Sequence, residues 1–251
     1  MNTTNHFNKA VMSIILLIFL VIVFGWMIRY FYKISLQKVS ISKLQSIHAQ
    51  LIQASRFSSM VHDEDMGSFK TDMPINLFAE KYFTPYLDIH TYCKGAQDNC
   101  WNTPQYRDLG GTPYYNKSLY SIVLTDGSVI GFNKDKNNLV TLIIDTNGKV
   151  KPNKLGQDVF LFSVYNIDPP PKICEKSKYE NVATFSGIHF GGLDNCGIPY
   201  DTYSYEELAS KDFTDGCNKK SPASPIGFGA GSSCAALLKL NAWTVDKNYP
   251  W

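Results

Sequence analysis

The chain has 251 residues, of which 24 are lysine or arginine and 22 are aspartate or glutamate, so its formal net charge is only +2. No stretch is dense in basic residues, which argues against a nucleic-acid partner. Hydrophobic residues make up 44% of the chain, enough to form a buried core even without the apolar N-terminal segment.

The first predicted element is an uncharged apolar segment that runs from Ala10 to Ile28. As a helix it would extend about 28 Å, close to the hydrocarbon thickness of a bilayer. A cleaved signal peptide is one alternative, but the Arg-Tyr-Phe-Tyr-Lys sequence that follows suits a signal peptidase poorly. A buried core helix is another, although few soluble helices are apolar on every face for this length. We therefore predict a single-pass transmembrane helix within residues 1–33, in contact with membrane lipid.

Two signals conflict on the orientation of this helix. Lys9 and the amino terminus precede the apolar segment, whereas four basic residues follow it by position 43, which by the positive-inside rule places the large domain in the cytoplasm. Six cysteines spread through loops indicate disulfides and an oxidising compartment instead. We give the cysteines more weight because the segment before the helix is very short. The protein is expected in the cytoplasmic (inner) membrane, with its C-terminal domain extracytoplasmic.

A second helical pattern continues directly from the first. Residues 34–60 contain no glycine or proline, and their apolar side chains recur at three- and four-residue spacing. We expect one long helix from about Asn8 to Arg56, with an amphipathic outer half that packs on the rest of the protein. The run from His62 to Gly67 ends the helix, and we interpret its three carboxylates as a solvated helix end.

Residues 61–251 have the pattern of a β-rich domain. A short aromatic helix is expected within residues 75–89, and a final short helix begins at Cys234. Asp126-Gly127 separates two apolar runs and predicts a hairpin with a type I′ turn. A long helix followed by an antiparallel sheet is α+β architecture. The predicted strands are residues 119–125, 128–132, 139–145 and 158–164.

The six cysteines fall into three sequential pairs, although fifteen pairings are open to six cysteines. Neighbour pairing is the simplest arrangement, because each pair brackets a loop rich in glycine, aspartate, asparagine or proline. No CxxC motif and no cysteine–histidine spacing typical of a zinc site is present. The predicted disulfides are Cys93–Cys100, Cys174–Cys196 and Cys217–Cys234.

The turn that follows the third predicted strand carries a set of oxygen ligands. Asp145 and Asn147 stand two residues apart beside a glycine, as at the start of a calcium loop, and Asn153 and Asp158 follow. The same residues also form a good turn, no acid occupies the bidentate position, and three nearby lysines would repel an ion. We expect no cofactor, with weak calcium binding at these four residues as the alternative.

No pattern of a catalytic site is evident. The glycine-rich segment 227–231 lacks both a preceding strand and the Lys-Ser/Thr pair of a phosphate loop. The five histidines share no spacing, and no Gly-x-Ser-x-Gly elbow occurs. We expect a protein that is not an enzyme.

Several motifs belong together as the features of one family. They are Ala79-Glu-Lys-Tyr-Phe-Thr-Pro-Tyr-Leu, Cys100-Trp101, the run from Asp145 to Phe160, Cys234-Ala-Ala, Asn241-Ala-Trp243 and Tyr249-Pro-Trp251. With the apolar helix that continues as an amphipathic one, they resemble the type IV pilins and type II secretion pseudopilins. The resemblance implies a long helix packed on an antiparallel sheet and other pilin or pseudopilin subunits as partners. It also implies assembly through the apolar helix, for which the candidate residues are Ile14, Leu17, Val21 and Phe24.

The N-terminus departs from the pattern of that family. No glycine precedes the apolar run, since the first is Gly25, and Ala10 to Ile28 contains no acid. A minor pilin or pseudopilin therefore fits better than a major filament subunit. The alternative is a signal-anchored extracytoplasmic binding or adhesion domain that never assembles into a filament.

Overall fold

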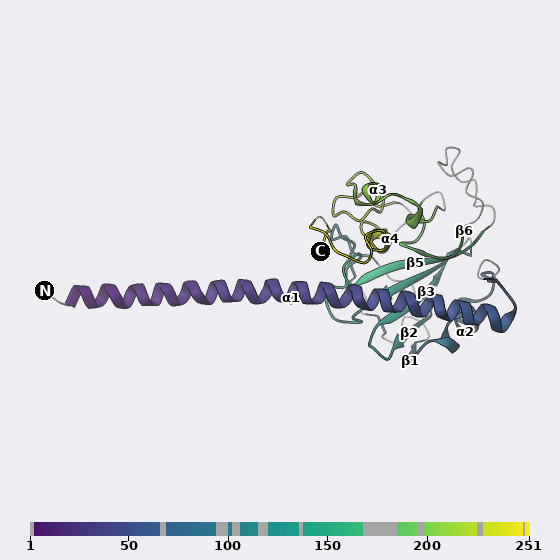
Figure 1. Ribbon diagram of the computed structural model, residues 1–251, viewed down its shortest axis with the longest axis horizontal. Helices are drawn as coiled ribbons and strands as arrows, with labels where there is room; N and C mark the ends of the chain where they lie inside the picture. Colours follow the sequence, from purple (N-terminus) through teal and green to yellow (C-terminus); the bar gives the residue numbers. More distant parts are fainter. Residues whose placement is uncertain are drawn as a thin grey trace. The chain divides into compact units, whose positions relative to one another are not determined.

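The structure is a computed structural model in which the chain forms two compact units, Met1–Val39 and Ser40–Trp251. Figure 1 shows the elements of both units with their labels. The residues it describes are 3–65, 69–93, 100–101, 106–114, 120–135, 138–167, 185–194, 198–224, 228–247 and 249–251.

Helix α1 spans Thr3–His62, so it is longer at both ends than the sequence predicts. It ends at the charged run, as expected, and Asp63 directly after it has a left-handed backbone with a φ of 52°. The first unit contains the apolar part of α1, and the second unit begins at Ser40, inside the same helix.

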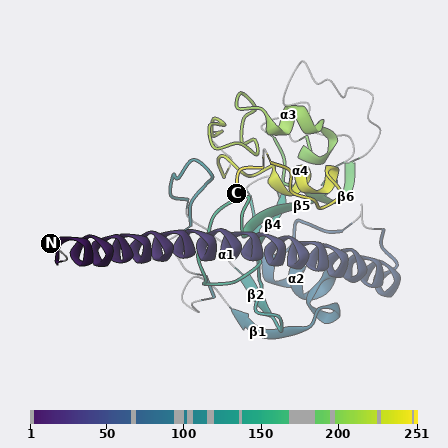
Figure 2. The same ribbon diagram turned by 60° about the vertical axis from the view of Figure 1, so that its left-hand side comes forward.

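The part of α1 within the second unit forms one layer of the core. Its residues Leu44, Ile47, Leu51 and Ala54 are all fully buried and belong to the main hydrophobic cluster together with side chains of the sheet. The three- and four-residue spacing therefore marks the face of the helix that packs on the strands, as predicted. Figure 2 shows this part of α1 lying across the sheet in a second view.

The sheet is a six-stranded antiparallel meander in which each strand pairs with the next one along the chain. Because each strand is antiparallel to the next one in the chain, neighbouring strands can be joined directly by loops without a crossover helix. The strands are β1 (Ile89–Cys93), β2 (Tyr120–Leu124), β3 (Val129–Lys134), β4 (Val140–Asp145), β5 (Val159–Ile167) and β6 (Phe185–Phe190). The four predicted strands correspond to β2–β5, and the observed fold is the α+β arrangement of a long helix on an antiparallel sheet.

The β2–β3 hairpin turn differs from the type I′ turn that Asp126-Gly127 predicts. Gly127 has a φ of 83°, but Asp126 is not among the residues with positive φ. The amide of Gly127 donates to the carbonyl of Leu124, and the amide of Leu124 donates to the carbonyl of Ser128. This is a three-residue loop with one left-handed residue, a form favoured when only one position is glycine. The prediction of a hairpin is right, and the predicted turn type is wrong.

Both faces of the sheet are covered, which explains the long apolar runs in β4 and β5. Leu142 and Phe162 point into the cluster that includes α1. Ile143 and Leu161 point to the opposite face, where they pack with Trp101. Successive strand residues point to opposite faces of the sheet. A strand that is buried on both faces therefore does not alternate between apolar and polar residues.

Short helices complete the domain. Helix α2 (Ile75–Tyr82) and the 3-10 turn η2 (Thr84–Tyr86) correspond to the predicted aromatic helix. After β6 come η4 (Tyr200–Thr202), α3 (Tyr205–Ala209) and α4 (Cys234–Leu240). A capping box between Ser204 and Glu207 begins α3. Helix α4 begins at Cys234 as predicted and contacts β5 and β6.

Candidate functional site

The apolar part of α1 is the first candidate site. Within the described residues, α1 is the one helix long and apolar enough to cross a membrane, and none of its apolar window is buried. The four residues predicted for assembly are exposed by 58% at Ile14, 65% at Leu17, 64% at Val21 and 58% at Phe24. Their three- and four-residue spacing places them along one stripe of the helix. An exposed apolar surface of this length marks contact with lipid or with other proteins.

The second candidate site is residues 145–158, which we call the carboxylate loop. It connects β4 to β5, and the pairing of Asp145 with Val159 across these strands brings its two ends together. The amide of Thr146 donates to the carbonyl of Asp158 over 2.8 Å. The structure thus brings the four predicted oxygen-bearing residues into one connected loop. Asp145, Asn153 and Asp158 are buried in it, and Asn147 is half-buried.

Asp145 lies at the end of β4 on the sheet face opposite α1. Its Oδ2 accepts a hydrogen bond of 2.6 Å from the Tyr106 hydroxyl, and its Oδ1 accepts one of 3.1 Å from the amide of Asn147. Burial, reinforced by the nearby Asp158 carboxylate, raises the pKa of Asp145 well above its ordinary value.

Asp158 stabilises the other end of the loop. Its two carboxylate oxygens accept hydrogen bonds of 2.7 Å from the amides of Asn153 and Lys154, and the side-chain amide of Asn147 also bonds to it. Burial raises the pKa of Asp158 to about 6, although these hydrogen bonds oppose the shift. Both aspartates are therefore structural acceptors as well as buried charges.

The loop also bonds to the part of α1 that lies within the domain unit. The hydroxyl of Ser40 donates to the carbonyl of Gln157 over 2.7 Å and lies 2.7 Å from the hydroxyl of Thr146. Ser40 is the first residue of the domain unit. The carboxylate loop is thus bonded to the helix at the point where the domain begins.

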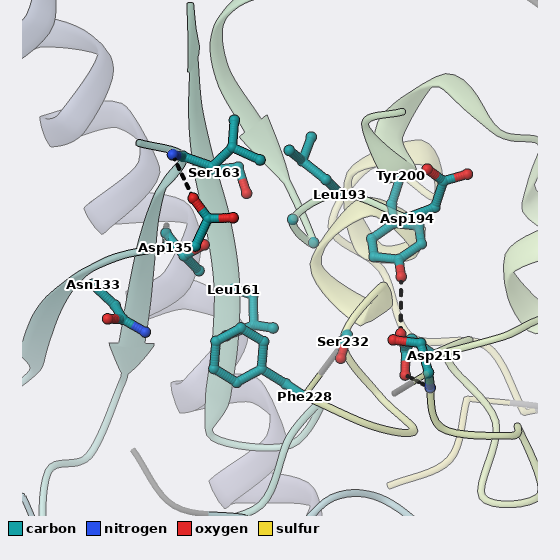
Figure 3. Close-up of a pocket in the computed structure, with 15 residues that line it drawn as sticks. Asn133, Asp135, Leu161, Ser163, Leu193, Asp194, Tyr200, Asp215, Phe228 and Ser232 are labelled. Atoms are coloured by element: carbon teal, nitrogen blue, oxygen red, sulfur yellow. Dashed lines mark hydrogen bonds between the residues drawn. The ribbon is translucent and has the colours of Figure 1, made fainter. Parts of the chain in front are cut away.

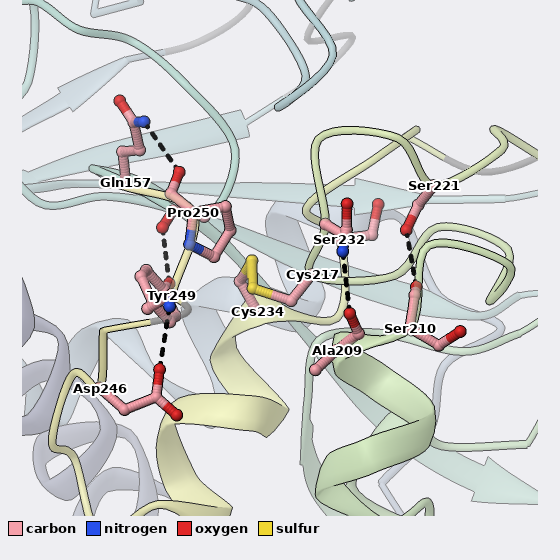
Figure 4. Close-up of a disulfide and its surroundings, with 12 residues drawn as sticks. Gln157, Ala209, Ser210, Cys217, Ser221, Ser232, Cys234, Asp246, Tyr249 and Pro250 are labelled. Atoms are coloured by element: carbon pink, nitrogen blue, oxygen red, sulfur yellow. Dashed lines mark hydrogen bonds between the residues drawn. A yellow bond between two sulfur atoms is a disulfide. The ribbon is translucent and has the colours of Figure 1, made fainter.

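The C-terminus packs on the same loop. The Tyr249 hydroxyl donates to the carbonyl of Gly156 over 2.6 Å, and the side-chain amide of Gln157 donates to the carbonyl of Pro250 (Figure 4). Gly156 has a φ of 73°, and a Cβ there would overlap the Sγ of Cys234. The glycine is needed both for its backbone conformation and for this close approach. The chain end, α4 and the loop therefore meet at one place.

Two of the three predicted disulfides are confirmed. Cys93 pairs with Cys100, and Cys217 pairs with Cys234, with Cα atoms 6.2 and 4.7 Å apart respectively. Figure 4 shows the second of these at the start of α4. Cys174 and Cys196 lie outside the described residues, so their pairing stays a prediction.

A cavity of about 190 Å³ lies between the sheet and the C-terminal loops (Figure 3). In it the Tyr200 hydroxyl donates to the carboxylate of Asp215, which also accepts from the amide of Ser224. Three aspartates line the cavity, and no histidine, lysine or arginine is among the described residues that line it.

Sequence reasoning missed three residues that complete the carboxylate loop. Tyr106 binds Asp145, Tyr114 packs beside Tyr106, and Ser40 binds the loop from α1. Ser40 had a detectable signal, because it precedes Leu44 by one helical turn and so lies on the apolar face of the helix. The two tyrosines had no signal in the sequence, because only the folded backbone joins their segment to the loop. One such bond runs from the amide of Arg107 to the carbonyl of Asn153.

Comparison of the chain with protein-family models, curated proteins and solved structures finds no match.

Proposed function

We propose that the chain is a membrane-anchored, pilin-like structural subunit, a minor pilin or pseudopilin of a bacterial type II secretion or type IV pilus-type assembly. The contrast between the two parts of α1 carries the proposal. Residues 12–32 expose nearly all of their apolar side chains, whereas most apolar side chains from Ile41 to Ala54 are buried against the sheet. A subunit that assembles through one helix and presents a folded domain needs both properties in the same helix.

The exposed part of α1 has two environments that satisfy it, lipid and the helices of other subunits. Its side chains carry no charge between Met12 and Ile28, so neither environment would incur the cost of burying an ion. Without an acid in this stretch, contact with a neighbour depends on packing along Ile14, Leu17, Val21 and Phe24. This favours a subunit present at low copy beside others that carry an acid.

The disulfides support an extracytoplasmic location for the domain. Cys93–Cys100 and Cys217–Cys234 are both formed, and structural disulfides persist in oxidising compartments. The domain would then lie outside the cytoplasmic membrane, held there by α1.

A solitary, anchored binding or adhesion domain is the second candidate function. The cavity beside Tyr200 and Asp215 favours it, because leucine and phenylalanine side chains together with a few carboxylates and hydroxyl groups form the kind of lining that binds a small ligand. In this case α1 would serve only as an anchor and would contact no other subunit.

Cysteine crosslinking in cells of the native organism distinguishes the two candidates. Single cysteines at Ile14, Leu17 and Val21 should crosslink to a second protein with its own N-terminal apolar helix, identified by mass spectrometry. A cysteine at Glu206, exposed on the domain, is the matched control and should not form that product. Abundant ladders of this chain alone would indicate a major filament subunit. The absence of every helix-to-helix crosslink would contradict assembly and favour the anchored domain.

A further inference from the structure

One buried carboxylate in the cavity of Figure 3 has no charged partner. Asp215 is 1% exposed, and among the described residues no lysine, arginine or histidine forms an ion pair with it. It lines the cavity together with Asp135 and Asp194. A buried charge is normally paired or coordinated to a metal. An ionised Asp215 therefore calls for a positive partner that the described residues do not supply.

The hydrogen bonds of Asp215 orient its carboxylate and leave acceptor positions open. Its Oδ1 accepts from the amide of Ser224 over 2.9 Å, and its Oδ2 accepts from the Tyr200 hydroxyl over 3.3 Å. An ionised carboxylate has about four acceptor positions, so about two remain. The hydroxyl of Ser224, which also lines the cavity, is buried and makes no hydrogen bond. Orphaned buried polar atoms are rare in folded proteins, and this one belongs to the residue whose amide binds Asp215.

The backbone around Asp215 holds this carboxylate in place. Its amide donates to the carbonyl of Pro222 over 2.8 Å, and its carbonyl accepts from the amide of Ser233 over 3.2 Å. Its φ of 57° lies in the left-handed region, which residues other than glycine keep where the surrounding structure fixes them, often at binding sites. The disulfide Cys217–Cys234 joins the same loop to α4. Asp215 is therefore oriented before a ligand arrives, which lowers the cost of binding.

Apolar side chains form another part of the lining. They are Leu139, Leu161, Leu193 and Phe228, and in Figure 3 Leu161 lies across from Asp215. An aromatic ring attracts a cation over its face, and aliphatic side chains favour a ligand with an apolar part of its own. Among the described residues no three side chains of metal-binding type are placed to hold one ion. The lining therefore favours an organic cation over a metal ion.

We propose that this cavity binds a small organic cation, an ammonium or guanidinium group on a short apolar stem, with Asp215 as its counter-ion. The volume of 190 Å³, at about 30 Å³ for each water it could hold, leaves room for about six non-hydrogen atoms. A lysine or arginine side chain and a free alkylamine are of this size. The cation donates to the open positions of Asp215, and its stem packs against Leu161 and Phe228.

The inference deepens the second candidate function, since it names the class of ligand that an anchored binding domain would take, and it rests on that cavity. It does not depend on whether α1 contacts other subunits. Ligand binding is measured on the purified chain, whereas assembly is measured by crosslinking in cells, so either can fail while the other holds. A filament subunit with this cavity would present the same cation site on its domain.

Binding is measured by calorimetry on the full chain in micelles of a non-ionic detergent, with protein-free micelles as the blank. Butylamine should bind at one saturable site with a Kd of about 10⁻⁴–10⁻³ M, a range suited to so small a ligand. 1-Butanol has nearly the same size without the charge and should bind at least about tenfold more weakly, because it leaves Asp215 without a counter-ion. Equal affinities for the two ligands would overturn the proposal, and so would saturable binding of glucose without binding of butylamine.

Two peptides distinguish the sources of the cation. Acetyl-Gly-Lys-Gly-amide presents the same ammonium stem as butylamine, and the matched peptide carries norleucine in place of lysine. Binding of the lysine peptide alone of the two would identify the ligand as a side chain of a partner protein. Binding of butylamine without the lysine peptide would identify it as a free amine. If neither butylamine nor the lysine peptide binds, the proposal is wrong.

The variant Asp215→Asn should weaken butylamine binding by at least about tenfold. It should still fold, because the amide side chain can keep the bonds to Ser224 and Tyr200. Its matched control is Asp212→Asn, which removes the same charge from an exposed position three residues away and should bind as the native chain does. An Asp215→Asn variant that binds butylamine like the native chain would contradict the assignment of Asp215. The comparison of butylamine with butanol on the native chain needs no variant and decides the question even if Asp215→Asn fails to fold.

Discussion

Replacing Leu51 by alanine tests the packing of α1 on the sheet. Leu51 is 0% exposed and lies in the cluster that joins α1 to the strands. The substitution removes about three buried carbon atoms, whose burial stabilises the folded state, and it leaves a cavity in the core. The two effects together should lower the free energy of unfolding by about 3–4 kcal/mol. For a domain of this size the Tm should fall by about 6–16 °C.

The control for Leu51→Ala is Leu77→Ala in helix α2. Leu77 is 48% exposed, so the same chemical change should lower the free energy of unfolding by about 1 kcal/mol or less. Both variants are compared with the native chain in one detergent by near-ultraviolet circular dichroism during heating. If Leu51→Ala and Leu77→Ala melt at the same temperature, the outer part of α1 does not form a layer of the core.

Further predictions concern acid sensitivity and the disulfides. Burial among aromatic rings, with Lys239 nearby, lowers the pKa of His48 to about 4. The folded state then binds fewer protons than the unfolded state between pH of about 6.5 and 4, so His48 lowers stability as the pH falls through this window. His48→Gln should therefore reduce the loss of unfolding free energy between neutral and acidic pH, and an unchanged loss would contradict burial of a neutral ring. Replacing Cys217 and Cys234 by serine opens a loop with a sequence separation of 17 and should lower the free energy of unfolding by about 3 kcal/mol. Peptide mapping of the non-reduced protein should recover Cys174–Cys196 as the third pair, and any other partner for either cysteine would refute neighbour pairing.

Much of the fold could be predicted because it depends on local pattern. The spacing of Leu44 to Ala54 marks the buried face of α1, and the long apolar runs mark β4 and β5. These signals depend on periodicity and turn residues within a few positions. Strand β1 was missed because Ile89–Cys93 lies at the sheet edge and is largely exposed. Strand β6 was missed because Phe185–Phe190 contains a glycine and stands among the loops of the later cysteines.

The carboxylate loop shows a different limit of the sequence. Asp145, Asn147, Asn153 and Asp158 were identified from spacing alone, but the pattern could not show that Asp158 returns to Asp145 across the strand pair. Burial of both carboxylates is a tertiary property, and so is the hydrogen bond from Tyr106 to Asp145. Sequence spacing therefore identified the residues, and the fold determines how they can act together.

We propose that α1 crosses the membrane once and holds the domain outside the cytoplasm. Single cysteines at Glu206, exposed on the domain, and at Asn5, before the apolar segment, can be treated with a membrane-impermeant maleimide in intact spheroplasts and again after lysis. We expect the cysteine at Glu206 to be labelled in intact spheroplasts, and the cysteine at Asn5 to be labelled only after lysis. The reverse pattern would place the domain in the cytoplasm, and labelling of both cysteines before lysis would show that α1 does not cross the membrane.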